Sequence, residues 1–156
     1  MDRLLQHLHP MLVHFPIALL MTSVLFDAAC AIFKRDSLRE GALWLLILGL
    51  LGGIGSVWSG FQVEDLAEKA GIAESLIERH ETWALVTMGL FAALLAGRLF
   101  LRNRFGPATL TVYLVLAVVG VGTLSVAGYF GGNLVYEHGA GVLHTAPIAP
   151  LAGSAQ

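Results

Sequence analysis

Residues 41–61 read GALWLLILGLLGGIGSVWSGF and carry no charged side chain. A transmembrane helix needs about 20 consecutive, mostly apolar residues, so this stretch alone is long enough to cross a bilayer. The composition of the whole chain supports that interpretation, because 56% of its 156 residues are hydrophobic and only 13% are charged. A soluble domain carries about 25% charged residues. The sequence therefore predicts an integral membrane protein in contact with the lipid bilayer.

Three further apolar stretches accompany the first one. They lie at about 12–33, 81–101 and 108–130. A span must satisfy its own backbone hydrogen bonds inside the lipid, which makes each of them a helix. The connections at 34–40 and 102–107 are short and force neighbouring helices to run antiparallel. We predict an all-α, up-down four-helix bundle that forms one domain over residues 1–145, followed by a flexible tail at 146–156.

Positive charge gathers on one side of this predicted bundle. The side that holds the two short connections carries Lys34, Arg35, Arg39, Arg98, Arg102 and Arg104. The opposite side holds the longer acidic connection, predicted as a loop at 62–80. Arginine- and lysine-rich connections stay in the cytoplasm. We therefore expect a multi-pass protein of the bacterial inner membrane, with both termini in the periplasm.

All six histidines belong to the predicted periplasmic side. They are His7, His9 and His14 around the start of the first span, His80 at the start of the third, and His138 and His144 after the fourth. Imidazole ligates haem iron and transition metals, and it changes charge near neutral pH. The one-sided distribution therefore predicts a ligand site on that side.

The topology suggests which histidines pair. In an up-down bundle the first and third helices are diagonal, whereas helices in direct contact are only ~8–10 Å apart, too close for a porphyrin between two imidazoles. His14 and His80 lie on the diagonal pair at similar depth, which predicts bis-histidine ligation of haem b. His9 and His138 are alternates or a second pair, and Tyr136 with His138 could cap the site.

The first span begins irregularly, with His9-Pro10-Met11-Leu12-Val13-His14-Phe15-Pro16. Proline suits a first helical turn and disrupts a helix interior, so we expect a helix from Pro10 with a kink at Pro16, or a helix that begins only at Pro16. On a regular helix His9 and His14 are separated by ~140° and do not share a face. At the other end, residues 131–133 (GGN) predict a helix stop or a sharp bend.

Small residues line the second and fourth spans. Gly52, Ser56 and Gly60 form one such stripe, which is typical of close helix packing and would also admit a flat macrocycle. Inside the first span, Asp27 is an intramembrane carboxylate, which by default suggests function. We expect a structural hydrogen bond to a neighbour such as Tyr113, Thr109 or Thr111, because no acidic or histidine partner for a proton relay lies deeper in the bundle.

Two longer motifs carry a resemblance to a known family. Residues 9–19 (HPMLVHFPIAL) resemble the opening, and residues 131–142 (GGNLVYEHGAGV) the closing motif, of the bacterial membrane-protein family called domain of unknown function 2231. Trp58-Ser59-Gly60 and His80 fit it as well, so the resemblance covers nearly the whole chain. It implies a four-helix fold distantly similar to di-haem b-type cytochromes. Those cytochromes carry haem-ligating histidines at two depths in the membrane, whereas the histidines of this chain all lie on one side. This difference argues against electron transfer across the whole bilayer.

Three functions compete at this point. The first is a small haem-binding electron-transfer protein that exchanges electrons with a periplasmic cytochrome c or a quinone. The second is a membrane protein that binds copper, zinc or iron through the histidine cluster, since imidazole suits all three metals. The third is a non-catalytic accessory subunit.

Other classes find less support. An enzyme acting alone lacks a catalytic constellation, and a net charge of −2 gives no case for nucleic acid. The single Cys30 excludes an internal disulfide. Whether the chain forms a homo-oligomer or joins a larger membrane complex stays open.

Overall fold

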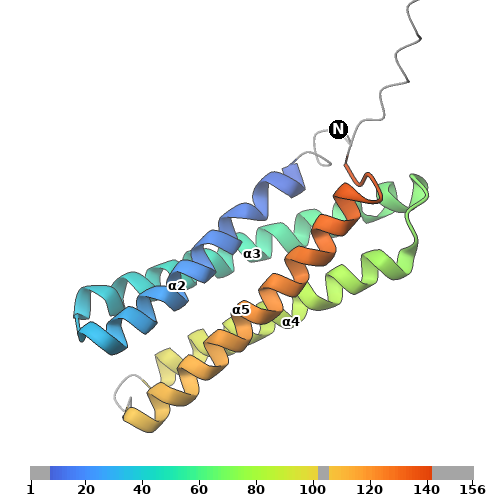
Figure 1. Ribbon diagram of the computed structural model, residues 1–156. Helices are drawn as coiled ribbons and strands as arrows, with labels where there is room; N and C mark the ends of the chain where they lie inside the picture. Colours follow the sequence, from blue (N-terminus) through green and yellow to red (C-terminus); the bar gives the residue numbers. More distant parts are fainter. Residues whose placement is uncertain (1–7, 102–105, 142–156) are drawn as a thin grey trace, which may run out of the picture.

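Four long helices make up most of the chain in the computed structural model, which describes residues 8–101 and 106–141. They are α2 (His14–Phe33), α3 (Asp36–Lys69), α4 (Glu74–Phe100) and α5 (Pro107–Tyr136) (Figure 1). Each is long and apolar enough to cross a membrane, the first span counting from Leu8. Across the described ranges there is no β-strand. The predicted all-α membrane class is confirmed, while His7, His144 and the predicted tail lie outside the described residues.

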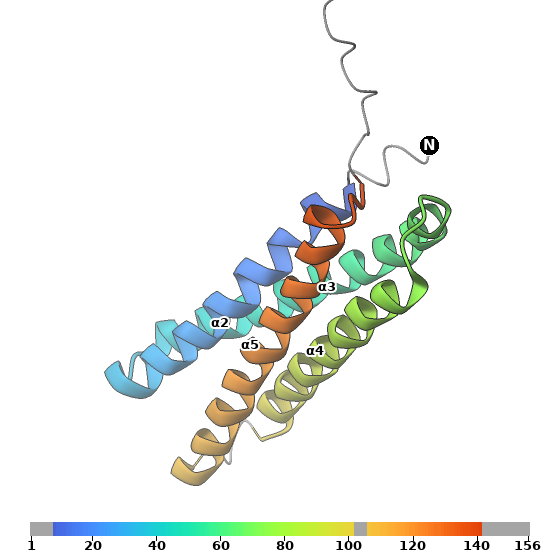
Figure 2. The same cartoon turned by 45° about the vertical axis from the view of Figure 1, so that its right-hand side comes forward.

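The helices form a closed cycle of neighbours. α2 packs along α3 and α4 packs along α5, giving two helical hairpins, and α3–α4 and α2–α5 contacts join the hairpins. The pairs α2–α4 and α3–α5 are therefore diagonal, as the topology predicted. Figures 1 and 2 show the start of α2, the α3–α4 turn and the end of α5 together at one end. We call this the histidine end and the opposite one the turn end.

Three of the helices are longer than the sequence predicted, and two of them, α3 and α4, extend into the predicted loop between them. α3 runs to Lys69 and α4 begins at Glu74, so most of the predicted 62–80 loop is helical and only residues 70–73 connect the two helices. The prediction was wrong because low hydropathy marks the edge of the lipid, whereas Glu, Lys, Leu and Ala remain strong helix formers in water. Gly71 makes the turn in the left-handed region, with φ +90°, which glycine adopts without strain.

A small apolar cluster holds this turn against the bundle. Ile72 and Ile77 are buried with Leu134 near the end of α5. The turn is therefore packed, and it fixes the start of α4 relative to the end of α5.

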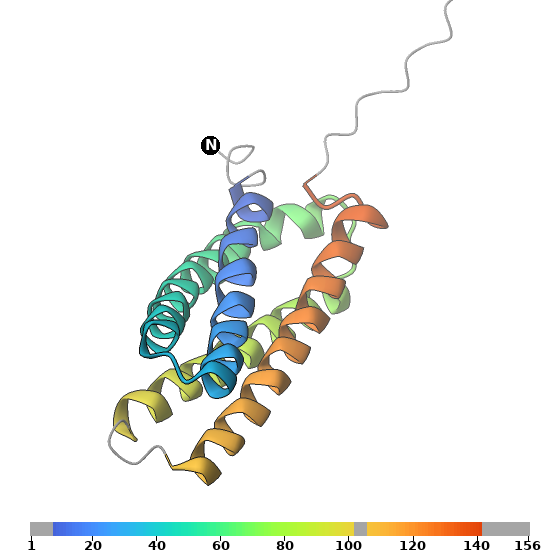
Figure 3. The same cartoon turned by 60° about the vertical axis from the view of Figure 1, so that its left-hand side comes forward.

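The main core lies between the helices in their middle and turn-end parts. All four helices contribute to it: Leu20, Val24, Leu46, Leu50, Phe91, Leu94, Tyr113 and Ala117 are buried together. Small residues let large side chains approach closely. A Cβ built on Gly49 of α3 would lie 2.7 Å from Leu20 of α2, and one on Gly120 of α5 would lie 3.2 Å from Phe91 of α4. Close helix packing at glycine is thus observed in both hairpins, as expected in membranes. Figure 3 shows the two helices of each hairpin running side by side.

The outer faces of the helices are apolar too. Large exposed side chains include Leu25, Trp44, Leu51, Trp58 and Phe100. A helix that is hydrophobic all round is typical of a membrane span. The exposed Trp44 and Trp58 of α3 are ~21 Å apart along the helix at 1.5 Å per residue, a spacing that suits aromatic side chains near the two membrane interfaces.

The irregular ends also differ from the prediction. Residues 8–12 form a short helical turn, the regular pattern breaks at Val13, and α2 begins at His14. The break precedes Pro16, which has no N–H to donate to the carbonyl four residues earlier. The stop predicted at 131–133 is wrong, because α5 continues to Tyr136. Glycine is tolerated there since the helix packs closely against His80 at this point.

Candidate cofactor site

His9 is held from α3 by a serine. Its Nδ1 lies 2.9 Å from the Ser59 hydroxyl oxygen. That hydroxyl donates its only proton to the Ser56 carbonyl oxygen at 2.8 Å, so it accepts from the imidazole. The proton of the neutral His9 ring therefore sits on Nδ1, and Nε2 keeps the lone pair that a metal would use.

His80 is also protonated on Nδ1, but its hydrogen-bond partner is a backbone carbonyl. Its Nδ1 lies 3.0 Å from the carbonyl oxygen of Ala127 on α5. A carbonyl only accepts hydrogen bonds, so Nδ1 donates and Nε2 is again the free ligand nitrogen. In known metal sites, a ligating histidine almost always uses its second ring nitrogen in this way.

Each of these two rings lies against a glycine on a neighbouring helix. A Cβ built on Gly60 of α3 would lie 3.2 Å from Cε1 of His9, and one on Gly131 of α5 would lie 2.8 Å from Cε1 of His80. The glycine-lined helix faces therefore receive imidazole rings at the histidine end.

His9 and His80 lie at the same end of the bundle, on different helices. The two imidazoles lie close enough to interact electrostatically. His9 belongs to the span that continues into α2, and His80 belongs to α4, so the two rings come from different hairpins. The first and third spans are diagonal as predicted, and the sequence analysis placed His9 among the alternates.

His14 takes a different position from the one that the predicted pairing needs. It is exposed, and its Nδ1 contacts the carbonyl oxygen of Pro10 in its own turn at 2.6 Å. His9 and His14 differ in direction along the same span, so when His9 packs against Ser59, His14 faces outward. In this structure His9 contacts a neighbouring helix and His14 does not, and the predicted pairing of His14 with His80 stays a prediction.

His138 and Tyr136 lie at the end of α5 and are both exposed. The chain turns beyond them through Gly139 and Gly141, each with φ +71°. A shallow hollow beside this segment is lined by Gly128, Tyr129, Gly132, Asn133, Tyr136 and Glu137. The predicted capping role of Tyr136 and His138 stays a prediction.

The number of available ligands bears on the kind of cofactor. Among residues 8–101 and 106–141, no group of three or more His, Cys, Asp and Glu side chains is placed to hold a metal ion. Zinc sites use three or four protein ligands, whereas haem iron needs one or two because the porphyrin supplies the others. Binding of haem or of a metal ion by His9, His14, His80 and His138 stays a prediction.

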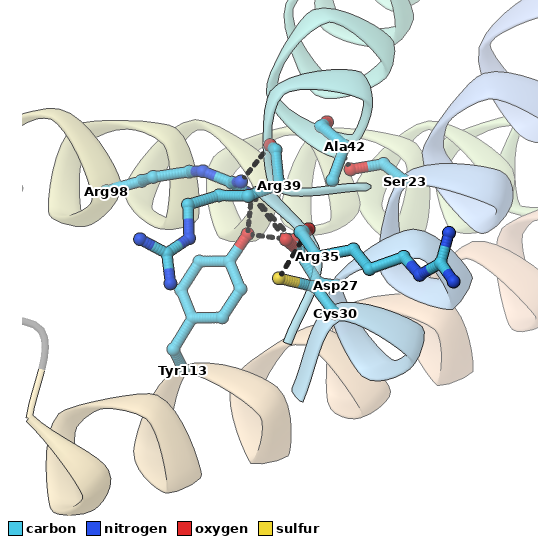
Figure 4. Close-up of polar contacts among 8 residues, drawn as sticks. All are labelled: Ser23, Asp27, Cys30, Arg35, Arg39, Ala42, Arg98 and Tyr113. Carbon is cyan, nitrogen blue, oxygen red and sulfur yellow. Dashed lines mark hydrogen bonds and ion pairs between the residues drawn. The ribbon is translucent and has the colours of Figure 1, made fainter. Parts of the chain in front are cut away.

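A second polar centre lies in the turn-end half of the bundle, where Asp27 is buried. Arg98 Nη1 donates to both Asp27 carboxylate oxygens at 2.7 Å, and the Tyr113 hydroxyl donates to Asp27 Oδ2 at 2.7 Å. Arg98 Nη2 donates to the carbonyl oxygen of Arg39 (Figure 4). The Asp27 and Arg98 side chains are only 7% and 10% exposed.

The expected partner Tyr113 is confirmed, and Arg98 was missed. The positive-inside argument had counted Arg98 as a charge at the membrane surface. Its position two residues before the end of α4 at Phe100, at the same end as Asp27, was the signal that could have paired them. Thr111, another expected partner, bonds the Pro107 carbonyl of its own helix.

Comparison with known proteins gives one family. The family model described as "Predicted membrane protein (DUF2231)" matches residues 6–144, which include both residues of the His9–His80 pair. No curated protein and no solved structure matches the chain.

Proposed function

The chain belongs to the DUF2231 family of predicted membrane proteins, and for this member we propose haem-binding electron transfer, with Nε2 of His9 and Nε2 of His80 as the axial ligands. The observation that supports the proposal is that two imidazoles from different hairpins lie within electrostatic range of each other at one end of the bundle, each with its Nδ1 held by a hydrogen bond. Haem bound there would supply one-electron redox chemistry at the histidine end.

The hydrogen bonds prepare both rings for ligation. A bond at Nδ1 selects the tautomer that leaves Nε2 free and holds the ring orientation. Ser59 does this for His9 and the Ala127 carbonyl does it for His80. Rings that are ordered before ligand binding lose less conformational entropy on binding.

The location of the pair suggests how electrons would enter and leave. Both histidines lie at one end of the bundle, so electrons would be exchanged on that side of the membrane. We place that side in the periplasm of a bacterial inner membrane, following the charge distribution. A periplasmic cytochrome c or a quinone near the interface is the redox partner that fits this position.

The experiment is an optical spectrum of the protein purified in mild detergent from haem-sufficient bacteria. We expect a Soret band and, after dithionite, the α-band of a six-coordinate haem. His9→Ala and His80→Ala should each remove the six-coordinate signature. His14→Ala is the matched control, because His14 is exposed and should leave the spectrum unchanged.

Other outcomes decide against haem. A wild-type protein without a Soret band excludes it, and copper, zinc or iron found by elemental mass spectrometry without porphyrin would establish the metal-binding alternative. Absence of porphyrin and of metal would leave the accessory-subunit role. Loss of the spectrum in His14→Ala, with His9→Ala intact, would restore the pairing of His14 with His80.

A further inference from the structure

The Asp27 centre joins all four helices at one point. Asp27 comes from α2, the Arg39 carbonyl from α3, Arg98 from α4 and Tyr113 from α5. Figure 4 shows their polar groups converging between the helices. Arg98 Nη1 also lies 3.3 Å from the Tyr113 hydroxyl oxygen, and its guanidinium stands 5.9 Å from the centre of the Tyr113 ring.

These contacts cross between the two hairpins. Arg98 of the α4–α5 hairpin donates hydrogen bonds to Asp27 and to the Arg39 carbonyl of the α2–α3 hairpin. Tyr113, also of the α4–α5 hairpin, donates a hydrogen bond to Asp27. By contrast, the bond from Ser23 to the Ala42 carbonyl stays within one hairpin. The Asp27 centre is therefore a polar connection between hairpins whose other contacts are largely apolar.

The proposed haem ligands are divided between the same two hairpins. His9 is fixed to α3 through Ser59, and His80 is fixed to α5 through the Ala127 carbonyl. Neither ring can move independently of its own hairpin without losing its hydrogen bond. The separation of the two rings therefore follows the placement of one hairpin relative to the other.

We propose that Asp27, Arg98 and Tyr113 form a clamp that sets the relative position of the two hairpins and, through it, the spacing of His9 and His80. The second half rests on the proposed function, while the first half stands without it. Arg98 and Asp27 act here as positioning residues.

The membrane environment explains why a polar clamp is effective. An apolar helix face interacts about as favourably with lipid as with another apolar helix face. Apolar packing alone therefore fixes the position of one helix relative to another only weakly. Separating Arg98 from Asp27 would leave charges unpaired in a low-dielectric region, which is strongly unfavourable. The paired arrangement is thus favoured over displaced ones, and several donors and acceptors define its geometry.

The first experiment measures hairpin separation directly, with no need for a cofactor. Spin labels are placed at Ile32→Cys on α2 and Phe100→Cys on α4, both at exposed positions, in a Cys30→Ser background that removes the only native cysteine. Pulsed electron–electron double resonance in lipid nanodiscs then gives the distribution of distances between the two spin labels. A label pair within one hairpin, Ile32→Cys with Trp44→Cys, is the control.

Substitutions in the clamp should change only the distance between hairpins. Arg98→Met removes every donor, and we expect a longer mean distance and a broader distribution for the 32–100 pair, with the 32–44 pair unchanged. Arg98→Lys can still place one charged nitrogen between the Asp27 oxygens, so it should recover most of the wild-type distribution. Unchanged 32–100 distances in Arg98→Met would overturn the clamp.

A milder variant covers the case in which Arg98→Met does not fold. Tyr113→Phe removes one hydroxyl and keeps the ring, so it should fold and give a smaller broadening of the 32–100 distances. A wild-type distribution in both Tyr113→Phe and Asp27→Asn would equally overturn the clamp.

The second experiment reads the effect at the histidine end. In a haem-loaded protein, Arg98→Met should shift the midpoint potential and introduce a high-spin component in the electron paramagnetic resonance spectrum, and Arg98→Lys should restore the wild-type spectrum. If the distances change while the potential and spin state do not, the link to His9 and His80 is wrong. If the wild-type protein binds no haem, the proposed function fails, and the distance measurement still decides the clamp.

Discussion

Hydrogen-bond partners fix which ring nitrogen carries the proton in His9 and His80. Ser59 uses its proton on the Ser56 carbonyl and so must accept from His9, while the Ala127 carbonyl can only accept from His80. The tautomers of both rings follow from donor and acceptor chemistry alone. A histidine without such a partner would divide its population between two tautomers, of which only one presents Nε2.

Removal of the Ser59 hydroxyl should weaken haem binding without disturbing the fold. In Ser59→Ala the His9 ring loses its hydrogen-bond partner and its fixed orientation, and we expect haem affinity to fall by ~10- to 100-fold, the usual effect of losing such a supporting group. Haem titration of the apoprotein followed at the Soret band measures this. Ser56→Ala is the control, because it leaves the backbone carbonyl that Ser59 uses; equal losses in both variants would contradict the assignment.

Gly131 should be as important to the site as a ligand is. An added Cβ would lie 2.8 Å from Cε1 of His80, so Gly131→Ala must push the ring away from α5 and break its bond to Ala127. We expect loss of the six-coordinate spectrum and a destabilisation of about 1–3 kcal/mol, as for other overpacked sites. Gly128→Ala on the same helix meets nothing within 4 Å and should leave both the spectrum and the melting temperature unchanged.

At the scale of helices, glycine sets how closely the members of a hairpin approach. A Cβ on Gly49 would lie 2.7 Å from Cδ2 and 3.3 Å from the backbone nitrogen of Leu20. The side chain can shift, but the backbone of α2 cannot shift without moving the helix. The α2–α3 hairpin thus depends on one small residue facing one large one.

Gly49→Ala should therefore destabilise the protein by about 1–3 kcal/mol, measured by thermal unfolding in detergent. The double variant Gly49→Ala with Leu20→Ala should be less destabilised than the sum of the two single variants, since each change makes room for the other. Gly55→Ala, on the same helix with nothing within 4 Å, is the control. A melting temperature for Gly49→Ala equal to that of Gly55→Ala would show that α2 does not pack here as described.

The sequence predicted elements better than it predicted contacts. Four spans, their antiparallel order and the diagonal placement of the first and third followed from hydropathy and connection length. The inward position of His9 and the outward position of His14 did not, because they depend on a break at Val13 and on a serine of another helix. Arg98 was missed for a related reason: hydropathy treats an arginine near a helix end as a surface charge, and only a partner such as Asp27 reveals that it is buried.

At the scale of the whole molecule, orientation in the membrane decides which compartment the histidine end serves. The turn end carries Lys34, Arg35 and Arg39 as exposed charges near the helix ends. Arg98 belongs to the same end, but its charge is paired with Asp27 and should contribute less to orientation than the sequence suggests. Three exposed basic residues close to a short turn are still sufficient to favour the cytoplasm for that end.

We therefore expect alkaline phosphatase fused after Gln156 to be active, because that enzyme folds only after export, and a fusion in the α2–α3 turn after Lys34 to be inactive. Green fluorescent protein at the same two points should give the opposite pattern. Replacing Lys34, Arg35 and Arg39 with glutamine should mix the two orientations, whereas Arg98→Gln should not, since its charge is already neutralised by Asp27. An active fusion after Lys34 and an inactive one after Gln156 would place His9 and His80 on the cytoplasmic side, where a periplasmic cytochrome could not reach them.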